Sequence, residues 1–328
     1  MLAAGESMNS AIIGLGVIGK VHYDTLKNQG ENIVAVCDVD ESKLASFDAE
    51  RKYTDYKRMI EDGGIDVVHI CTPHYLHADM SVFALEHDVN VLCEKPLCIN
   101  YEDIARIQKA QDESKAAFGV CFQNRFNNSS VFAKEYLKDK RVSFALALVL
   151  WHRDAAYYAT GEWRGKKATE GGGVCINQAI HTLDLLQWIL SMPQKVCAKA
   201  ENRSLQGVIE VEDTAIATFF GQDYSSVFIA SNTMSKDLPV EIRFVFDGNR
   251  VLTLYPDKVL IDGEVADYET DVKWQGKTSY GNGHEKLIRN FYDCVASGKK
   301  FEIDAYEAAK ALKEVLAIYK SNGEEVLV

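Results

Sequence analysis

The chain has no long hydrophobic run, no cluster of positive charge and no proline-rich linker. Its longest apolar stretch, from Val142 to Trp151, is too short to cross a bilayer as a helix and contains Ser143. The formal net charge of -12 argues against nucleic acid or an anionic membrane as a partner, because both attract clustered cations. An anionic substrate is not excluded, since a local basic pocket can form in an acidic protein.

The 8 cysteines show no metal-binding pattern. No CxxC pair and no Cys/His cluster has the spacing of a zinc site, so no bound metal is predicted. Several, such as Cys37 and Cys93, lie inside apolar strand-like runs, which indicates small buried side chains in a reducing compartment. The first ten residues lack the basic and apolar regions of a signal peptide, so we expect a cytoplasmic protein.

The first 125 residues alternate short apolar runs with amphipathic segments. Short buried strands that alternate with helices predict a parallel, doubly wound sheet with helices on both faces. An α/β Rossmann domain is therefore predicted over residues 8–126. The runs lie at 11–13, 33–37, 67–70, 89–93 and 117–122, with helical patterns at 17–28, 41–50, 76–86 and 101–113.

After residue 126 the pattern changes. Consecutive strands with tight turns predict an antiparallel sheet, so residues 127–328 are assigned to a second, α+β domain. Two helices close the chain, the last with Asp304 as N-cap and Gly323 as its stop. The expected order is a helix at 131–139, a strand at 142–151, a polar stretch at 152–173, a helix at 174–190 and strands at 196–201, 214–220, 226–231, 240–246, 250–254 and 259–261.

A glycine-rich turn follows the first predicted strand. The sequence GLGVIG has the GxGxxG spacing of a dinucleotide-binding turn and leads into a helix. Gly14 permits the tight turn, Gly16 lets the backbone approach a pyrophosphate, and Gly19 lets helix and strand pack closely.

The free N–H groups at the start of that helix, near Val17 and Ile18, favour a bound anion. Asp38 closes the second strand, where it can accept hydrogen bonds from ribose hydroxyls and repel a 2′-phosphate. The alternative, that Asp38 merely begins the next helix, is weaker because Asp40 already precedes Glu41 as an N-cap. NAD is therefore expected in preference to NADP.

A lysine follows the fourth apolar run. Glu94 and Lys95 come directly after the strand, and Pro96 ends its pairing. The carboxyl ends of such strands face the ligand crevice, where a lysine can stabilise an alkoxide-like oxygen. The alternative is an ordinary surface lysine.

Three further segments are expected near the dinucleotide. Thr72 and Pro73 close the preceding strand, and His77 begins a helix, where it is either a cofactor contact or a polar helix-start residue. Asn124 lies where the chain crosses between the two predicted domains. We count these residues, with Glu94 and Lys95, among the candidate cofactor contacts.

A third motif opens with three glycines and continues as a predicted helix. Asn177, His181 and Asp184 fall at i, i+4 and i+7, so one face of a continuous helix would carry all three. A single helix histidine is more often structural. Two polar neighbours of His181 on the same helix face favour the interpretation that this face lines a cleft.

With these motifs, the chain resembles the glucose–fructose oxidoreductase / inositol dehydrogenase / MocA (Gfo/Idh/MocA) family of NAD(P)-dependent enzymes. The matching segments are Gly14–Gly19, Cys71–Ala78, Glu94–Leu97 and Gly171–Trp188. The resemblance implies a Rossmann domain and a C-terminal domain with an open, mostly antiparallel sheet. It also implies homodimers or homotetramers through that sheet and a terminal helix near the domain junction.

The resemblance also implies residue roles. Lys95 matches the family's catalytic lysine and His181 its catalytic histidine. Many members carry aspartate where this chain has Asn177, although asparagine occurs among relatives that resemble sugar-nucleotide and amino-sugar dehydrogenases. Asp184 matches a position that contacts substrate or supports the histidine. Trp163 and Arg164 match a pattern near the nicotinamide and substrate, and the residues that could line a sugar site are Trp151, His152, Arg153, Tyr157 and Tyr158.

The implied reaction is hydride transfer between a secondary alcohol of a sugar, polyol or sugar derivative and NAD. His181 would act as base and Lys95 would stabilise the substrate oxygen. Two alternatives remain open: an NAD-dependent glycoside hydrolase of the same family, and a non-catalytic NAD- and ligand-binding sensor. Retention of both residues counts against the sensor.

Overall fold

The computed structural model describes residues 7–270 and 283–328, and the chain divides into two compact units. The first contains the chain up to Phe122 together with His284–Ala309. The second contains Gln123–Gly283 and Lys310–Val328. Within the described ranges, no helix is long and apolar enough to span a membrane.

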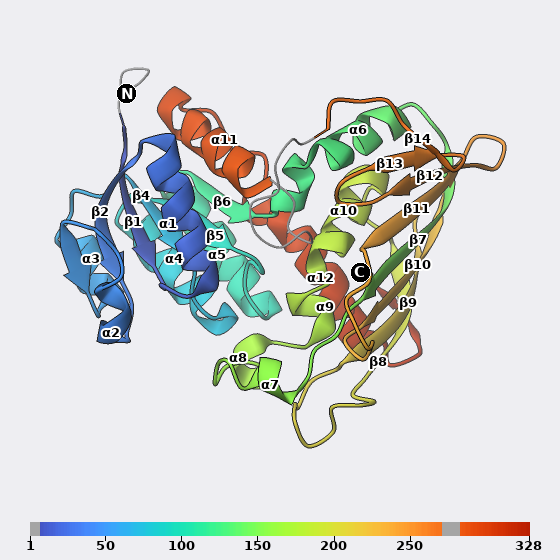
Figure 1. Ribbon diagram of the computed structural model, residues 1–328, viewed down its shortest axis with the longest axis horizontal. Helices are drawn as coiled ribbons and strands as arrows, with labels where there is room; N and C mark the ends of the chain where they lie inside the picture. The colour runs from blue at the N-terminus through green and yellow to red at the C-terminus, as the bar shows by residue number, and fades with distance from the viewer. Residues whose placement is uncertain (1–6, 271–282) are drawn as a thin grey trace. The chain divides into compact units, whose positions relative to one another are not determined.

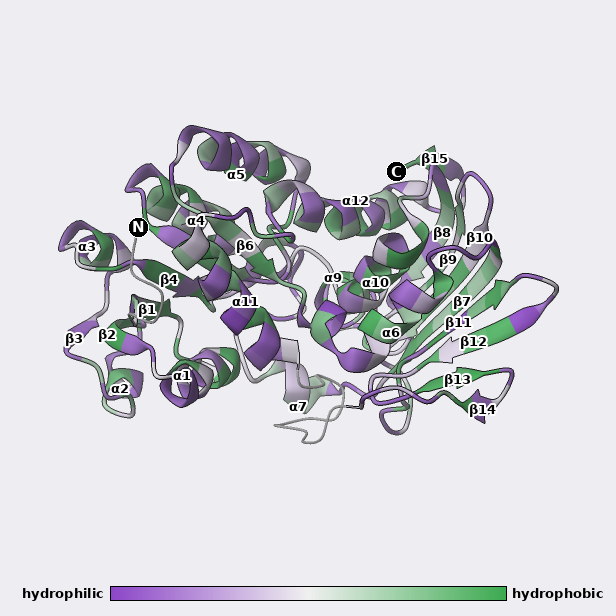
Figure 2. Cartoon of the chain, turned by 90° about the horizontal axis from the view of Figure 1, so that it is seen from above, coloured by the Kyte–Doolittle hydropathy of each residue, from purple (hydrophilic) through white to green (hydrophobic). Residues whose placement is uncertain are grey.

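The first unit contains a six-stranded parallel sheet in the order β3-β2-β1-β4-β5-β6, which confirms the doubly wound α/β prediction. Figure 2 shows α4 and α5 on one side of these strands and α1 and α11 on the other. The strands are β1 (Asn9–Ile13), β2 (Asn32–Cys37), β3 (Arg51–Tyr53), β4 (Val67–Ile70), β5 (Asn90–Glu94) and β6 (Phe118–Cys121). The helices are α1 (Val17–Gln29), α2 (Glu41–Leu44), α3 (Tyr56–Glu61), η1 (His74–Leu76), α4 (His77–Glu86), α5 (Tyr101–Glu113) and α11 (Gly283–Ser297).

The second unit contains a nine-stranded sheet in the order β14-β13-β12-β11-β7-β10-β9-β8-β15. Its pairs are antiparallel except β7 with β10, so the sheet is mixed but mostly antiparallel. The strands are β7 (Val142–Leu150), β8 (Lys195–Glu201), β9 (Thr214–Phe220), β10 (Ser225–Ser231), β11 (Glu241–Phe246), β12 (Arg250–Leu254), β13 (Val259–Ile261), β14 (Glu264–Val265) and β15 (Glu325–Leu327).

The helices of the second unit lie along one face of this sheet (Figure 1). Buried residues alternate with more exposed ones along β7, β9, β10 and β11, as expected for a sheet with one covered face. The helices are η2 (Gln123–Phe126), α6 (Asn128–Leu137), α7 (Ala155–Tyr158), α8 (Lys167–Glu170), α9 (Val174–Asn177), α10 (Ile180–Leu190) and α12 (Ala305–Ser321), whose first residues belong to the first unit.

The helix predicted at 41–50 is wrong beyond its first turn. Asp40 caps only the four residues of α2, since its side chain accepts from Ser42 N–H. The chain then forms β3, which pairs with β2 at the sheet edge. The charged residues Arg51 and Lys52 on β3 gave no apolar signature, because an edge strand is only partly buried.

The single helix predicted at 174–190 is also wrong. It breaks into α9 and α10 because Ala179 N–H bonds to Val174 C=O, five residues back, while Thr182 N–H bonds to Ala179 C=O, three residues back. Apolar periodicity continues across the break, so the pattern alone did not show it. Asn177 and His181 therefore lie on different helices.

Candidate functional site

The glycine turn has the backbone contacts that its motif predicts. Gly14 has φ +90°, and a Cβ there would lie 2.5 Å from Cys71 O. A Cβ on Gly19 would lie 1.9 Å from Gly14 O, which fixes α1 tightly against the turn. At Gly16 a Cβ would meet no described atom within 4 Å, so this side of the turn is open to a pyrophosphate. The turn therefore fits a dinucleotide.

Asp38 at the end of β2 lies beside the glycine turn. Its buried carboxylate accepts from Leu15 N–H at 2.8 Å and Asp40 N–H at 2.9 Å. Lys43 Nζ lies 3.2 Å from the same carboxylate, a charge that the sequence reasoning did not consider. Asp40, not Asp38, is the N-cap of α2. This geometry supports Asp38 as the residue that would meet the adenosine ribose.

His77 connects the segments that follow β4 and β5. Its Nδ1 lies 2.6 Å from Pro96 O and its Nε2 lies 2.9 Å from Thr72 O. The ring is fully buried, and this burial lowers the pKa of His77. The geometry favours a structural role for His77, which holds Thr72, Pro73 and Lys95 in place; a direct cofactor contact stays a prediction.

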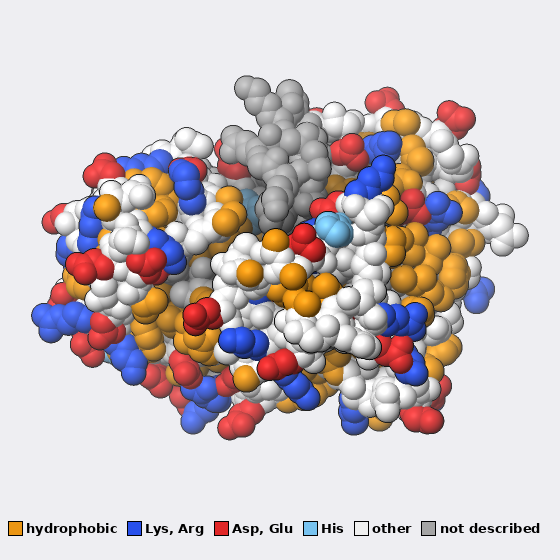
Figure 3. Space-filling model, turned by 60° about the horizontal axis from the view of Figure 1, so that its bottom comes forward, with side chains coloured by type: hydrophobic (Ala, Val, Ile, Leu, Met, Phe, Trp, Pro, Cys, Tyr) orange, Lys and Arg blue, Asp and Glu red, His pale blue; other side chains and the backbone are white. Residues whose placement is uncertain are grey.

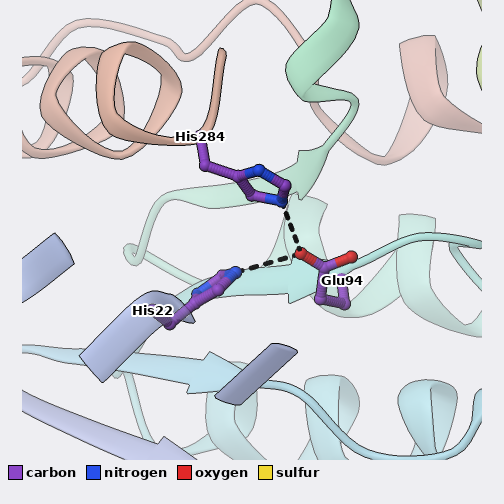
Figure 4. Close-up of side chains that lie close together, drawn as sticks. All are labelled: His22, Glu94 and His284. Carbon is purple, nitrogen blue, oxygen red and sulfur yellow. Dashed lines mark hydrogen bonds and ion pairs between the residues drawn. The ribbon is translucent and has the colours of Figure 1, made fainter. Parts of the chain in front are cut away.

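Glu94 is buried directly before Lys95, which is itself partly exposed. One carboxylate oxygen accepts from Lys95 N–H at 3.2 Å, and the other lies 3.0 Å from His22 Nε2 and 3.7 Å from His284 Nε2 (Figure 4). Burial alone would raise the pKa of Glu94, but hydrogen bonds from both histidines hold it well below its usual range. The sequence reasoning missed both histidines, because they come from α1 and the start of α11.

The second unit fixes the glycine-rich start of α9 through Glu212. This buried carboxylate accepts from Gly173 N–H at 2.8 Å, Cys175 N–H at 3.0 Å and Tyr319 O–H at 2.9 Å. A Cβ on Gly173 would lie 1.9 Å from Glu212 O, and one on Gly172 would lie 1.9 Å from Tyr319 Oη. The glycines thus permit close approach to backbone and to α12, and a carboxylate stabilises the N-terminus of α9.

Asn177, where many relatives carry aspartate, donates from its amide to buried Glu170. Burial raises the pKa of Glu170 to about 7, although Gly165 N–H, Asn177 and Arg164 favour its ionised form. Position 177 itself carries no carboxyl group in this chain, but the side chain of Asn177 is hydrogen-bonded to one, that of Glu170. Sequence reasoning missed it because Glu170 was assigned to a polar loop.

His181 and Asp184 lie near the start of α10 and are buried. Arg125 Nε and Nη2 donate to the two Asp184 oxygens at 2.8 and 2.6 Å, a bidentate pair inside the second unit. This pair connects α10 to η2, next to buried Asn124, and supports a positioning role for Asp184. A direct contact with substrate stays a prediction.

The residues predicted to line a sugar site form a cluster of arginines and aromatic rings. Two guanidinium groups lie near the Tyr157 ring, with the Cζ atoms of Arg153 and Arg164 at 5.1 and 4.8 Å from its centroid. Its hydroxyl accepts from Arg164 at 2.7 Å and from Gln178 at 3.1 Å. The structure thus brings Trp151, Arg153, Tyr157, Trp163 and Arg164 together within the second unit.

Two family models match the chain. Residues 8–122 match the oxidoreductase family with NAD-binding Rossmann fold, and residues 133–250 match the GFO/IDH/MocA C-terminal domain. The chain therefore belongs to the Gfo/Idh/MocA family, as its motifs indicated, and its first unit is an NAD-binding Rossmann fold.

Curated relatives match part of the chain. The inositol 2-dehydrogenase of Salmonella typhimurium strain LT2 is 28% identical over 197 residues, which cover 58% of this chain and 56% of that protein. The 2,7-anhydro-N-acetylneuraminate hydratase of Mediterraneibacter gnavus is 28% identical over 209 residues, covering 62% and 54%. The matched segment thus spans little more than half the length of these relatives.

Solved structures match almost the whole chain. The WlbA dehydrogenase from Bordetella pertussis, in complex with NADH and UDP-GlcNAcA, aligns with a TM-score of 0.88 at 24% identity over 99% of this chain and 98% of that one. A levoglucosan dehydrogenase in complex with NADH aligns with a TM-score of 0.84 at 19% identity over 98% and 99%. At these identities the likeness establishes the fold.

Proposed function

We propose that this protein is an NAD-dependent dehydrogenase acting on a secondary alcohol of a sugar, polyol or sugar derivative. One observation carries the proposal. Asp38, the glycine turn, Thr72 and Lys95 follow, in that order, the four neighbouring parallel strands β2, β1, β4 and β5. The carboxyl ends of parallel strands share one edge of a sheet, where such folds bind ligands. The relative named as an inositol 2-dehydrogenase supports the substrate class.

The bound nicotinamide would supply the hydride acceptor. Lys95 holds the substrate hydroxyl and stabilises the negative charge that develops on its oxygen. His181 takes the hydroxyl proton, and its neighbours in the second unit keep α10 in place through the Arg125–Asp184 pair. Residues 8–126 are proposed to bind cofactor and residues 127–328 to bind substrate.

Arginines and aromatic rings support sugar recognition. Rings such as Trp151 and Tyr157 offer flat apolar surfaces for sugar faces, and a guanidinium can donate to hydroxyls, carboxylates or phosphates. Arg153 is paired with the Asp237 carboxylate at 3.0 Å, whereas Arg164, also partly exposed, donates to the Tyr157 hydroxyl at 2.7 Å beside Trp163. We therefore assign the main polar contact to Arg164.

The test is a screen of inositols, sugars, anhydrosugars and nucleotide sugars with NAD, followed by NADH absorbance and product analysis. Accumulation of NADH and the corresponding ketone in equal amounts supports the proposal. Glycoside cleavage without net NADH would identify a hydrolase instead. Saturable binding of NAD and a ligand without turnover would identify a sensor.

We further propose that the protein assembles as a homodimer or homotetramer through the open face of the nine-stranded sheet. The outward positions of β7 and its neighbours are apolar, among them Leu146, Leu148, Val227 and Ile229, which are only partly buried. Figure 3 shows hydrophobic side chains gathered over this part of the molecule, whereas charges are scattered elsewhere on the same face. An apolar sheet face of this kind typically marks an interface.

Light scattering tests this assembly. Ile229→Asp should dissociate the oligomer, and Thr218→Ser on the neighbouring strand should not. A monomeric wild-type protein would contradict the assembly without affecting the proposed activity. We also propose a reducing, cytoplasmic location. All eight cysteines lie within the described ranges and none forms a disulfide bond, which agrees with this proposal.

A further inference from the structure

Three potential metal ligands converge in the interior of the first unit, and a fourth lies beside them. His22 Nε2, a Glu94 oxygen and His284 Nε2 lie within 4.8 Å of one another (Figure 4). Cys121 Sγ at the end of β6 lies 3.9 Å from the same His22 nitrogen. All four residues are buried, so the cluster is closed to solvent.

The spacing of these atoms suits a tetrahedral ion. Zinc bonds of about 2.0–2.3 Å place ligand atoms roughly 3.3–3.6 Å apart in a tetrahedron. The observed separations of 3.0 Å for His22–Glu94, 3.7 Å for His284–Glu94 and 3.9 Å for Cys121–His22 lie on both sides of that range. Small side-chain shifts would therefore bring the atoms of His22, Glu94 and His284 into coordination. Cys121, which lies outside this group of three, would complete the tetrahedron by moving toward them.

The charges also balance. One carboxylate, one thiolate and two neutral imidazoles neutralise a divalent cation, which avoids a net charge in the interior. Nitrogen, sulfur and carboxylate oxygen are the ligands that zinc prefers in proteins, and four protein ligands are typical of a structural site.

Hydrogen bonds behind the cluster are compatible with the required tautomer. A His22 ring bound through Nε2 carries its proton on Nδ1, which lies 2.7 Å from His69 Nδ1. His69 Nε2 lies 2.8 Å from Tyr292 Oη, which lies 2.7 Å from Ser10 Oγ. Each group can then donate to the next, and a metal-bound histidine is usually held by such a donation from its second ring nitrogen. Lys95 N–H orients the other Glu94 oxygen at 3.2 Å.

We propose that His22, Glu94, Cys121 and His284 form a structural zinc site that joins α1, β5, β6 and α11. The spacing of these residues in the sequence conceals the site, because each ligand comes from a different element. The ion would hold α11 against the sheet and keep Glu94 rigid beside Lys95. Metal content and the metal spectrum test this site, so the test does not depend on the proposed dehydrogenase activity.

The first experiment measures zinc in protein purified from zinc-supplemented cells and passed through a desalting column. About one zinc per chain is expected, and its removal by a chelator should lower Tm by about 5 °C or more. Anaerobic replacement by Co²⁺ should give the visible bands of a tetrahedral site and a near-ultraviolet thiolate-to-metal band.

Variants identify the ligands. Cys121→Ser should lose the thiolate band, and His284→Gln should lower Co²⁺ affinity at least 10-fold. Matched controls are Cys98→Ser, another buried thiol of the first unit, and His87→Gln, an exposed histidine. Circular dichroism and NAD binding confirm that each variant is folded.

Two results would overturn the proposal. One is a folded, NAD-binding wild type that contains less than about 0.1 zinc per chain and shows no tetrahedral Co²⁺ spectrum. The other is a Cys121→Ser spectrum identical to that of the wild type. In the first case the cluster would be only a buried hydrogen-bonded chain, with His22 Nε2 donating to Glu94.

Discussion

The parallel sheet of the first unit has helices on both faces, whereas the mixed sheet of the second unit has helices along one face. In the first unit the candidate residues follow strand ends, so the order of the strands alone brings Asp38 and Lys95 to one edge. In the second unit Asn177 lies on the four-residue helix α9, whose start Glu212 holds, and His181 lies on α10, which the Arg125–Asp184 pair joins to η2. Strand topology positions one set of residues and buried carboxylates position the other.

The strongest test of this comparison is Lys95→Ala. Removal of a lysine that stabilises a developing oxyanion should lower kcat roughly 100-fold or more. Because the glycine turn and Asp38 are separate from it, NAD affinity should change little. Steady-state kinetics and NAD titration check both statements. Lys109→Ala, an exposed lysine on α5, is the control, and near-normal turnover of Lys95→Ala would remove Lys95 from the mechanism.

The same contrast explains what the sequence could predict. Strand ends, the glycine turn and the Asp40 cap are local signals, so the strands of the parallel sheet were predicted to within two residues, except the polar edge strand β3. The start of α9 and the carboxyl partner of Asn177 depend on the long-range contacts of Glu212 and Glu170. The break between α9 and α10 leaves the apolar periodicity unchanged. His22 and His284 are more than 260 residues apart and no spacing rule joins them.

The second prediction concerns the pH dependence of the second unit. Burial raises the pKa of Glu170 to about 7, so the folded state binds its proton more tightly than the unfolded chain does. The stabilisation from Glu170 is fully present below the unfolded pKa, near 4.5, and is lost as pH rises through about 7. Glu170→Gln should abolish this loss, which amounts to at most roughly 3 kcal/mol.

Thermal denaturation of wild type and Glu170→Gln from pH 4.5 to 7.5 checks this prediction. The variant should gain stability relative to wild type as pH rises. Glu162→Gln, an exposed glutamate of the same segment, should follow the wild type. Parallel curves for wild type and Glu170→Gln would mean that Glu170 is ionised in the folded protein throughout this range.

A third prediction sharpens the role of strand ends in the first unit. Replacing Asp38 by Ser and Val39 by Arg removes the charge that would repel a 2′-phosphate and adds a cation at a position that is 88% exposed. It also frees Lys43, now 3.2 Å from Asp38. The preference for NAD over NADP should fall by roughly 10- to 100-fold, as for a lost charged hydrogen bond.

Titration of both cofactors measures that ratio. Asp40→Asn is the control, because asparagine caps α2 as well as aspartate does. If the unmodified protein already binds NADP more tightly than NAD, the charge of Lys43 rather than that of Asp38 determines the cofactor preference.

The smallest expected effect tests whether position 177 communicates with His181. An aspartate near a histidine favours the imidazolium and raises its pKa, so Asn177→Asp should move the acidic limb of kcat/KM to higher pH. The structure limits this shift. An aspartate at 177 would face the Glu170 carboxyl to which Asn177 now donates, and the two acids would share a proton. We therefore expect a shift on the order of half a pH unit.

The double variant Asn177→Asp with Glu170→Gln separates the two effects. Without a second carboxyl group, the aspartate stays ionised and the limb should move further than in the single variant. His181→Ala should abolish the limb together with most activity, since it removes the proposed base. If the limb stays in place in both aspartate variants, the break between α9 and α10 isolates position 177 from His181. If the limb survives in His181→Ala, another group takes the proton.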